Sequence, residues 1–300
     1  MQQTQDAKLK IFDIGFSAGM DGPGQRMVVY LKGCNLHCPW CAAPESIAAE
    51  PQVLFYPRRA RTPEHLVLAC PHGAVYLNGG QPHRHPEICA SCADFACLES
   101  CSPAFERVGA TVHITEIAAR AVRYGRFFGR RGGVTVGGGE PTLQLPSVAA
   151  LLERLRELRI HTALETNGTC RRLPELFPVL DLLLIDLKHP DTARCRALTG
   201  IGNETALRNI RQRQEQGGNM AVRIPLVPGI NDGETVLGKF AARLAAIGRM
   251  NVELIPFHRR GEPKWHALGR PMPLRSTPAL SAESREKALH ILRSRGLQVH

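Results

Sequence analysis

Three cysteines within eight residues constrain this chain more than any other feature. Cys34, Cys38 and Cys41 have the spacing Cys-x3-Cys-x2-Cys. The loop offers three thiolates, whereas a cubane [4Fe–4S] cluster normally takes four, so one iron would keep an open position for a small molecule. Zinc is the alternative, but zinc sites usually offer two pairs of ligands, and His37 lies inside the loop with poor geometry for a fourth. We therefore predict a reactive iron–sulfur cluster.

Length and cysteine content agree with an intracellular metalloprotein. The 300 residues suit one large α/β domain that carries an insertion. There is no N-terminal apolar run and no stretch of about 18 apolar residues, so we expect neither a signal peptide nor a membrane span. Eight of the ten cysteines fall between Cys34 and Cys101. Without a secretory signal they favour cluster or metal ligation over disulfides, and we expect a reducing, low-oxygen cytoplasm.

The formal charge of +11 raises the question of a nucleic-acid partner. The arginines are spread along the whole chain, in pairs separated by long intervals, and few aromatic residues stand between them to stack on bases. The pattern favours a solvated basic surface, facing an acidic protein, over a groove for RNA.

Six short apolar runs alternate with helical patterns, which predicts parallel strands joined by right-handed crossovers. The predicted strands are Met27–Lys32, Gly133–Val136, His161–Glu165, Leu182–Asp186, Ala221–Leu226 and Val252–Pro256. The predicted helices are Ser147–Leu158, Glu204–Gln216, Glu234–Ile247 and Ala282–Ser294, the last with Ser281 as N-cap and Gly296 as stop. Polar motifs follow the strands at their carboxyl ends, as in (β/α) barrels. A doubly wound sheet is the alternative, and the cysteine loop after the first strand favours an open, partial (β/α)6 barrel.

Several motifs in a fixed order make the chain similar to a known family. Besides the cysteine loop, they are Asp21-Gly22-Pro23-Gly24-Gln25-Arg26, Gly138-Gly139-Glu140-Pro141, Asp186-Leu187-Lys188, Thr199-Gly200, Pro228-Gly229-Ile230-Asn231-Asp232 and Pro256-Phe257-His258. From about Phe12 to Gly269 the chain resembles glycyl-radical enzyme activating enzymes of the pyruvate formate-lyase activating type, within the radical S-adenosylmethionine (SAM) superfamily.

The resemblance implies the activity of an oxidoreductase. Such an enzyme reductively cleaves SAM at a [4Fe–4S] cluster, and the 5′-deoxyadenosyl radical removes an α-hydrogen from one glycine of a glycyl-radical enzyme. A flavodoxin or ferredoxin would donate the electron. One alternative is a radical SAM enzyme that acts directly on a small metabolite or on RNA. Another is a non-catalytic iron–sulfur or zinc protein, which would make the ordered motifs coincidental.

The family's functional residues can be carried over position by position. Cys34, Cys38 and Cys41 would hold the catalytic cluster. The residues expected around SAM are Trp40, Gly138, Gly139, Glu140, Thr166, Asp186, Lys188, Arg223 and His258. For Trp40, core packing is an equal alternative. Glu165, Thr166 and Asp186 match positions that hold a monovalent cation, although the two acids could instead pair with Lys188 or Arg223.

The stretch 56–107, rich in Cys, Pro and His, interrupts the barrel between its first two strands. We therefore assign 1–55 and 108–300 to the barrel and 56–107 to a degenerate ferredoxin-like insertion. Related insertions hold two auxiliary clusters with eight cysteines. Here Ala60, Pro63 and Leu66 replace three of them, and those that remain are Cys70, Cys89, Cys92, Cys97 and Cys101.

One auxiliary [4Fe–4S] cluster is therefore expected. In such ferredoxins the fourth cysteine of each run ligates the other cluster, which favours Cys70 with Cys89, Cys92 and Cys97. The competing set replaces Cys70 by Cys101. Zinc, or an insertion without metal, is a further alternative.

Overall fold

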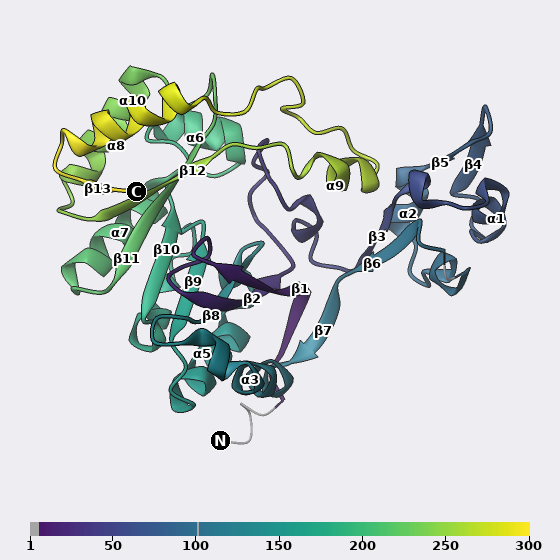
Figure 1. Cartoon of the computed structure of the whole chain (residues 1–300), viewed down its shortest axis with the longest axis horizontal. Helices are drawn as coiled ribbons and strands as arrows, with labels where there is room; N and C mark the ends of the chain where they lie inside the picture. The colour runs from purple at the N-terminus through teal and green to yellow at the C-terminus, as the bar shows by residue number, and fades with distance from the viewer. Residues whose placement is uncertain (1–5, 101) are drawn as a thin grey trace.

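The computed structural model describes residues 6–100 and 102–300 and is built around one nine-stranded sheet (Figure 1). The sheet has the strand order β13-β12-β11-β10-β9-β8-β2-β1-β7. Its strands are β1 (Lys8–Ala18), β2 (Gln25–Leu31), β7 (Ala110–His113), β8 (Gly133–Gly138), β9 (Thr162–Thr166), β10 (Leu182–Asp186), β11 (Met220–Leu226), β12 (Asn251–Pro256) and β13 (Gln298–Val299).

Strands β2 and β8 to β13 are parallel and lie side by side in chain order, as right-handed strand–helix repeats require. In the described part of the chain β13 and β7 form the two edges, so the sheet does not close. This confirms the predicted open α/β fold. Three strands of this sheet were not predicted. The short β13 adds a seventh parallel strand, and β1 and β7 extend the sheet in antiparallel fashion next to β2.

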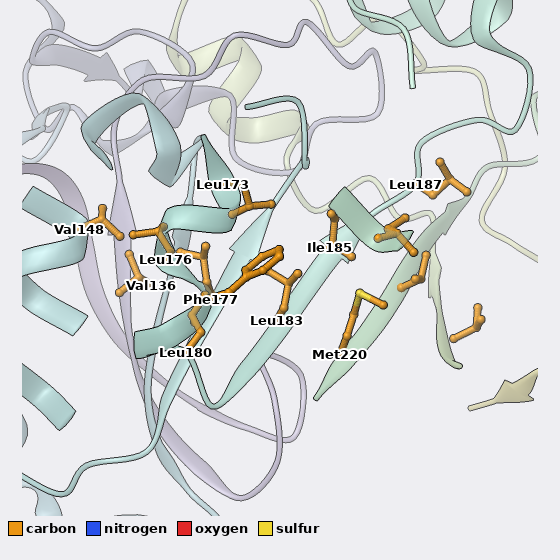
Figure 2. Close-up of a cluster of buried hydrophobic side chains, with 14 of the residues drawn as sticks. Val136, Val148, Leu173, Leu176, Phe177, Leu180, Leu183, Ile185, Leu187 and Met220 are labelled. Carbon is orange, nitrogen blue, oxygen red and sulfur yellow. The ribbon is translucent and has the colours of Figure 1, made fainter. Parts of the chain in front are cut away.

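Helices cover the outer face of the sheet and bury a continuous apolar core. They are α3 (Ile114–Arg123), α5 (Leu145–Glu157), α7 (Glu204–Glu215), α8 (Glu234–Ala245) and α10 (Ala282–Arg293). The short helix α6 (Thr192–Thr199) follows β10 and contacts the loop after β2, where Thr199 O accepts a hydrogen bond from His37 N. Ser281 caps α10 by accepting a hydrogen bond from the backbone N–H of Ser284 (3.0 Å), as predicted. Figure 2 shows part of this core, where Phe177 of the 3-10 segment Leu173–Val179 lies next to Leu183 of β10, and Leu176 of the same segment lies nearer Val136 of β8. In the residues that the structure describes, no helix is both long and apolar enough to span a membrane.

The segment between β2 and α3 contains a small body that lies to one side of the sheet (Figure 1). Its base is an antiparallel ribbon of β3 (Gln52–Phe55) and β6 (Phe105–Val108). Beyond the ribbon lie α1 (Pro63–Leu68), the hairpin of β4 (Val75–Asn78) and β5 (Gln81–Arg84), and α2 (Pro86–Ser91). The ribbon packs on α9 (Glu262–Ala267), where Leu54 and Val108 bury Ala267 and Leu268.

Inside the curved sheet the buried side chain of Arg26 lies against the ring of His161. Arg26 is fully buried and its Nη2 lies 3.3 Å from Nδ1 of His161. Burial, and then the Arg26 charge, lower the pKa of His161, and Asp181 opposes the shift.

We therefore expect the free energy of unfolding to fall as the pH drops through the ordinary histidine range near about 6.5. Below that pH the unfolded chain takes up a proton that the folded state resists. Urea unfolding of the metal-free chain at pH 5 and pH 7.5 measures this loss, and His161→Gln should lose less stability than the unsubstituted chain. Equal losses in both proteins would show that other groups cause the dependence.

Candidate active site

A cavity of about 890 Å³ opens at the carboxyl ends of the parallel strands. Loops at this edge meet because parallel strands all end on the same side. It collects most of the residues that the sequence singled out: Cys34, Cys38, Trp40, Cys41, Gly138, Gly139, Thr166, Asp186, Lys188, Arg223 and His258. Glu165 also lines the cavity, whereas Glu140 is fully buried behind its wall.

The cysteine loop follows β2 without regular secondary structure and is held by neighbouring segments. Its anchoring hydrogen bonds run from Gly33 N to Ser46 O (2.8 Å), from Cys34 N to Ile47 O (3.0 Å), from His37 N to Thr199 O (3.0 Å) and from Trp265 Nε1 to Cys41 O (2.9 Å). These bonds fix the loop from several directions, and its three cysteines all line the cavity.

The surroundings of the three thiols suit a cluster that carries positive iron. Burial raises the pKa of Cys38 to about 12 and that of Cys41 to about 11 in the metal-free chain, and Lys188 opposes both shifts. A buried thiolate therefore needs a positive charge beside it. A metal ion provides that charge, and thiols lose their protons when they bind it. Three soft sulfur donors match iron–sulfur chemistry. Beside them, Trp40 Nε1 is buried with no hydrogen-bond partner among the described residues.

The glycine turn after β8 packs directly against the start of the cysteine loop. The backbone N–H of Gly139 donates to Leu31 O (2.8 Å) and that of Glu140 donates to Gly33 O (2.7 Å). A Cβ atom on Gly139 would come within 2.1 Å of Gly33 O, and Gly138 has a positive φ of 101°. Both positions need glycine for this close approach, whatever ligand the turn contacts.

Glu140 ties three polar segments together from below the cavity. Its carboxylate accepts hydrogen bonds from Thr142 N (3.0 Å) and Oγ1 (2.6 Å), Thr166 Oγ1 (2.7 Å) and Asn167 N (2.8 Å). Asn167 Nδ2 in turn donates to Asn35 Oδ1 in the cysteine loop (2.9 Å). Burial raises the pKa of Glu140, and the bonds from Thr142, Asn167 and Thr166 oppose the shift. Glu140 thus aligns the ends of β8 and β9 with the loop.

The acidic residues on the cavity wall form ion pairs with basic residues at the same edge of the sheet. Lys188 Nζ donates to Asp186 Oδ2 at 2.7 Å. Arg223 bonds to Glu165 on one side and to Glu253 Oε2 on the other (2.8 Å). Burial raises the pKa of Glu165 to about 7, against the effect of Arg223. Burial lowers the pKa of Arg223, but the adjacent carboxylates together raise it above its ordinary value. The ion pairs that the sequence left open are therefore formed here, and a monovalent cation stays a prediction.

The sequence reasoning missed several residues of this edge. Asn35 and Asn167 join the cysteine loop to the end of β9, Glu253 completes the Arg223 pairing, and Trp265 holds Cys41. The only sequence signal was their place beside a motif or at a strand end. That signal does not say which partner each polar group selects.

In the insertion, four of the five expected ligands line one small cavity: Cys70, Cys89, Cys92 and Cys97. Cys101 lies outside the described residues. Burial raises the pKa of Cys97 to about 11, and the neighbouring Cys70, Cys89 and Cys92 add to this shift. His72 and Asp94 lie near Cys92, with one ligand atom of each within 4.8 Å of the others. That trio is the stereochemical basis for the zinc alternative.

Two of the three positions that lack a cysteine, Ala60 and Leu66, belong to an apolar cluster instead. Leu66 is 2% exposed and packs with Phe55 and Phe105, and Ala60 contacts the same cluster. Side chains thus fill a region where a second auxiliary cluster would need sulfur ligands. Elsewhere in the chain, Cys195 is buried beside Thr199, as expected of a structural thiol.

Comparison with known proteins adds an independent observation. The model of the radical SAM superfamily matches residues 28–237. The 4-hydroxyphenylacetate decarboxylase activating enzyme of Clostridioides difficile (strain 630) is 32% identical over 279 residues, 90% of this chain and 88% of that protein. The isethionate sulfite-lyase activating enzyme of Desulfovibrio desulfuricans is 35% identical over 274 residues, 88% of each chain. SuiB of Streptococcus suis, solved with its precursor peptide SuiA, shares the fold alone, with 12% identity and a TM-score of 0.52 over 91% of this chain and 48% of that one.

Proposed function

Since the chain belongs to the radical SAM superfamily, among the glycyl-radical enzyme activating enzymes, we propose that it installs a radical on one glycine of a large partner enzyme. The observation that carries the proposal is the three-cysteine loop facing an 890 Å³ cavity, whose wall holds Asp186, Lys188 and Arg223. Three thiols leave one iron of a cubane free, and the charged wall can orient a zwitterionic ligand beside it.

The proposed chemistry belongs to the cofactors, while the chain supplies binding and orientation. One electron from the bound cluster would cleave SAM to methionine and a 5′-deoxyadenosyl radical, which takes a glycine α-hydrogen and leaves as 5′-deoxyadenosine. Cys34, Cys38 and Cys41 would hold the cluster. The remaining cofactor contacts would come from Trp40, Gly138, Gly139, Thr166, Asp186, Lys188, Arg223 and His258, with Glu140 supporting the glycine turn. A monovalent cation beside Glu165, Thr166 and Asp186 belongs to the same proposal.

Two features of the cavity mouth support a protein substrate. Basic side chains of Arg260, Arg285 and His300 line it, which suits an acidic segment of a partner. The turn after β1 forms another part of the wall, and Arg223 holds it by donating to the carbonyl of Met20. We propose that this turn shapes the groove for the glycine-bearing loop.

The decisive experiment mixes reconstituted protein, SAM and a reductant with a candidate glycyl-radical enzyme under anaerobic conditions. Electron paramagnetic resonance should show a glycyl doublet in the partner, with 5′-deoxyadenosine formed alongside. Deoxyadenosine without a doublet for any glycyl-radical protein of the host would contradict activation and favour a direct small-molecule or RNA substrate. No SAM cleavage at all would favour a non-catalytic protein.

The insertion is proposed to hold one auxiliary [4Fe–4S] cluster on Cys70, Cys89, Cys92 and Cys97, which would relay an electron from flavodoxin or ferredoxin. We expect about eight irons per reconstituted chain, from two cubanes of four. Cys70→Ala should lower the count to about four, whereas Cys101→Ala should leave it unchanged. Iron and zinc analysis measures both. The opposite response of the two variants would assign Cys101 as ligand, and about four irons plus one zinc in the unsubstituted chain would assign zinc to the insertion.

A further inference from the structure

Arg84, the last residue of β5, lies between the insertion and the barrel. Its Nη1 donates to Val53 O in the ribbon of the insertion (2.9 Å), and its Nη2 donates to Ala267 O at the end of α9. The third group, Nε–H, is buried and meets no acceptor in good hydrogen-bond geometry in the part of the chain that the structure describes, although the guanidinium lies beside the Cys89 thiol. A buried donor that stays unpaired is destabilising, and more so when it belongs to a charged group. The Nε–H group of Arg84 therefore needs a hydrogen-bond acceptor.

The acceptors nearest at hand are sulfur atoms. Arg84 lines the same cavity as the four insertion cysteines. Burial lowers the pKa of Arg84, and Cys89 and Cys97 are the groups that oppose this shift. A cubane with four thiolate ligands carries net negative charge, and hydrogen bonds to its sulfurs and nearby charge set its reduction potential. Such a cluster would satisfy both the buried positive charge and the unpaired N–H.

The other contacts of Arg84 reach towards the catalytic loop through α9. Trp265 in this helix donates to Cys41 O (2.9 Å), and Lys264 pairs with Glu45, which follows the loop. Just beyond α9, a Cβ on Gly269 would come within 2.5 Å of Pro86 and 3.5 Å of Arg84 Nε. One short helix is thus bonded to the loop on one side and to Arg84 on the other.

We propose that Arg84 is a positioning residue of the auxiliary cluster, giving its sulfur ligands, chiefly Cys89, a fixed positive charge and an N–H donor. The other two nitrogens of Arg84 bond to Val53 O and Ala267 O, and so fix the position of the cluster relative to α9. Because Trp265 of α9 bonds to Cys41 O, they also fix it relative to the catalytic loop. The inference rests on the auxiliary cluster of the proposed function and deepens it. Because reduction adds a negative charge, a fixed cation stabilises the reduced cluster more than the oxidised one.

The test isolates the auxiliary signal by replacing Cys34, Cys38 and Cys41 with alanine, so that only the insertion can be loaded. A redox titration followed by electron paramagnetic resonance then gives its midpoint potential. Arg84→Met should lower the equilibrium constant for reduction of the cluster by about tenfold or more. This corresponds to a midpoint potential lower by about 59 mV for a one-electron step. Arg84→Lys keeps the charge but not the planar, forked guanidinium group, so it should lower the midpoint potential less. Arg58→Met is the matched control, because it removes an exposed arginine from the same insertion.

The parent is the variant with alanine at positions 34, 38 and 41 and no other change. Equal midpoint potentials in the parent and Arg84→Met, or equal shifts in Arg84→Met and Arg58→Met, would overturn the inference. Should Arg84→Met fail to hold iron, Arg84→Lys decides, and an unchanged potential in that variant would count against the role. A parent without any iron in the insertion would refute the auxiliary cluster itself, and this inference with it. A parent that is loaded but insensitive to Arg84 refutes only the inference.

Discussion

Cys38→Ala is expected to abolish SAM cleavage and glycyl-radical formation and to lower the iron content by about four atoms per chain. Cys38 is the middle ligand of the loop, and the metal-free thiol is held in a buried site next to Cys41 and Lys188. Two remaining thiols would no longer define a cubane with one open iron. Liquid chromatography of 5′-deoxyadenosine after single-turnover reduction measures the loss, with iron analysis in parallel.

Cys195→Ala provides the control for this prediction. Cys195 is buried in α6 beside Thr199 and does not line the cavity, so this substitution removes a thiol without removing a proposed ligand. It should keep its iron and its SAM cleavage. Residual deoxyadenosine in Cys38→Ala at the level of Cys195→Ala would contradict the assignment of the loop.

Glu140→Ala should destabilise the fold by about 3–5 kcal/mol, because it strands several buried donors at once. Thr142, Thr166 and Asn167 all donate to the Glu140 carboxylate, and Asn167 then contacts Asn35 of the cysteine loop. We expect the loss of stability to be joined by a lower iron content, since the loop would lose its tie to β9. Denaturant unfolding of the metal-free chain measures the first effect, and iron analysis measures the second.

Glu140→Gln is the matched variant for this site. It keeps the shape and one acceptor oxygen, but its amide group would face donors where the second oxygen accepted from Asn167 N. It should therefore lie between the unsubstituted chain and Glu140→Ala in stability. If Glu140→Ala unfolded at the same denaturant concentration as the unsubstituted chain, the carboxylate would not be the organiser of this edge.

Strong apolar runs made the parallel strands predictable from the sequence. Leu182–Asp186 is nearly all apolar because both faces are covered, and the observed β10 has the predicted bounds. β1 was missed because its pattern is mixed and its antiparallel place beside β2 is decided by tertiary packing. The two-residue β13 is too short for any pattern and exists only because β12 is there to pair with it.

The candidate active site, like the sheet, could be predicted from the sequence only in part. Spacing and strand-end position indicated which polar residues would meet, and the cavity contains nearly all of them. The choice of partners was not readable, because Glu165 could have paired with either Lys188 or Arg223. The arrangement of the strands decides it. Arg223 of β11 lies between Glu253 of the adjacent strand β12 and Glu165 of β9, which is on the other side of β10, whereas Lys188 lies two residues from Asp186 in the same segment.

The apolar cluster around Leu66 has a consequence for how the chain matures. A ferredoxin-like module that depends on two clusters cannot pack before iron and sulfide are delivered, since the cofactors form its interior. Here Leu66, Phe55 and Phe105 give the insertion a hydrophobic interior made of side chains, and Cys70 and Cys97 pack against it. Newly synthesised chain is therefore expected to fold this interior, with two of the proposed cluster ligands already beside it, before the cell's cluster-assembly machinery delivers iron and sulfide.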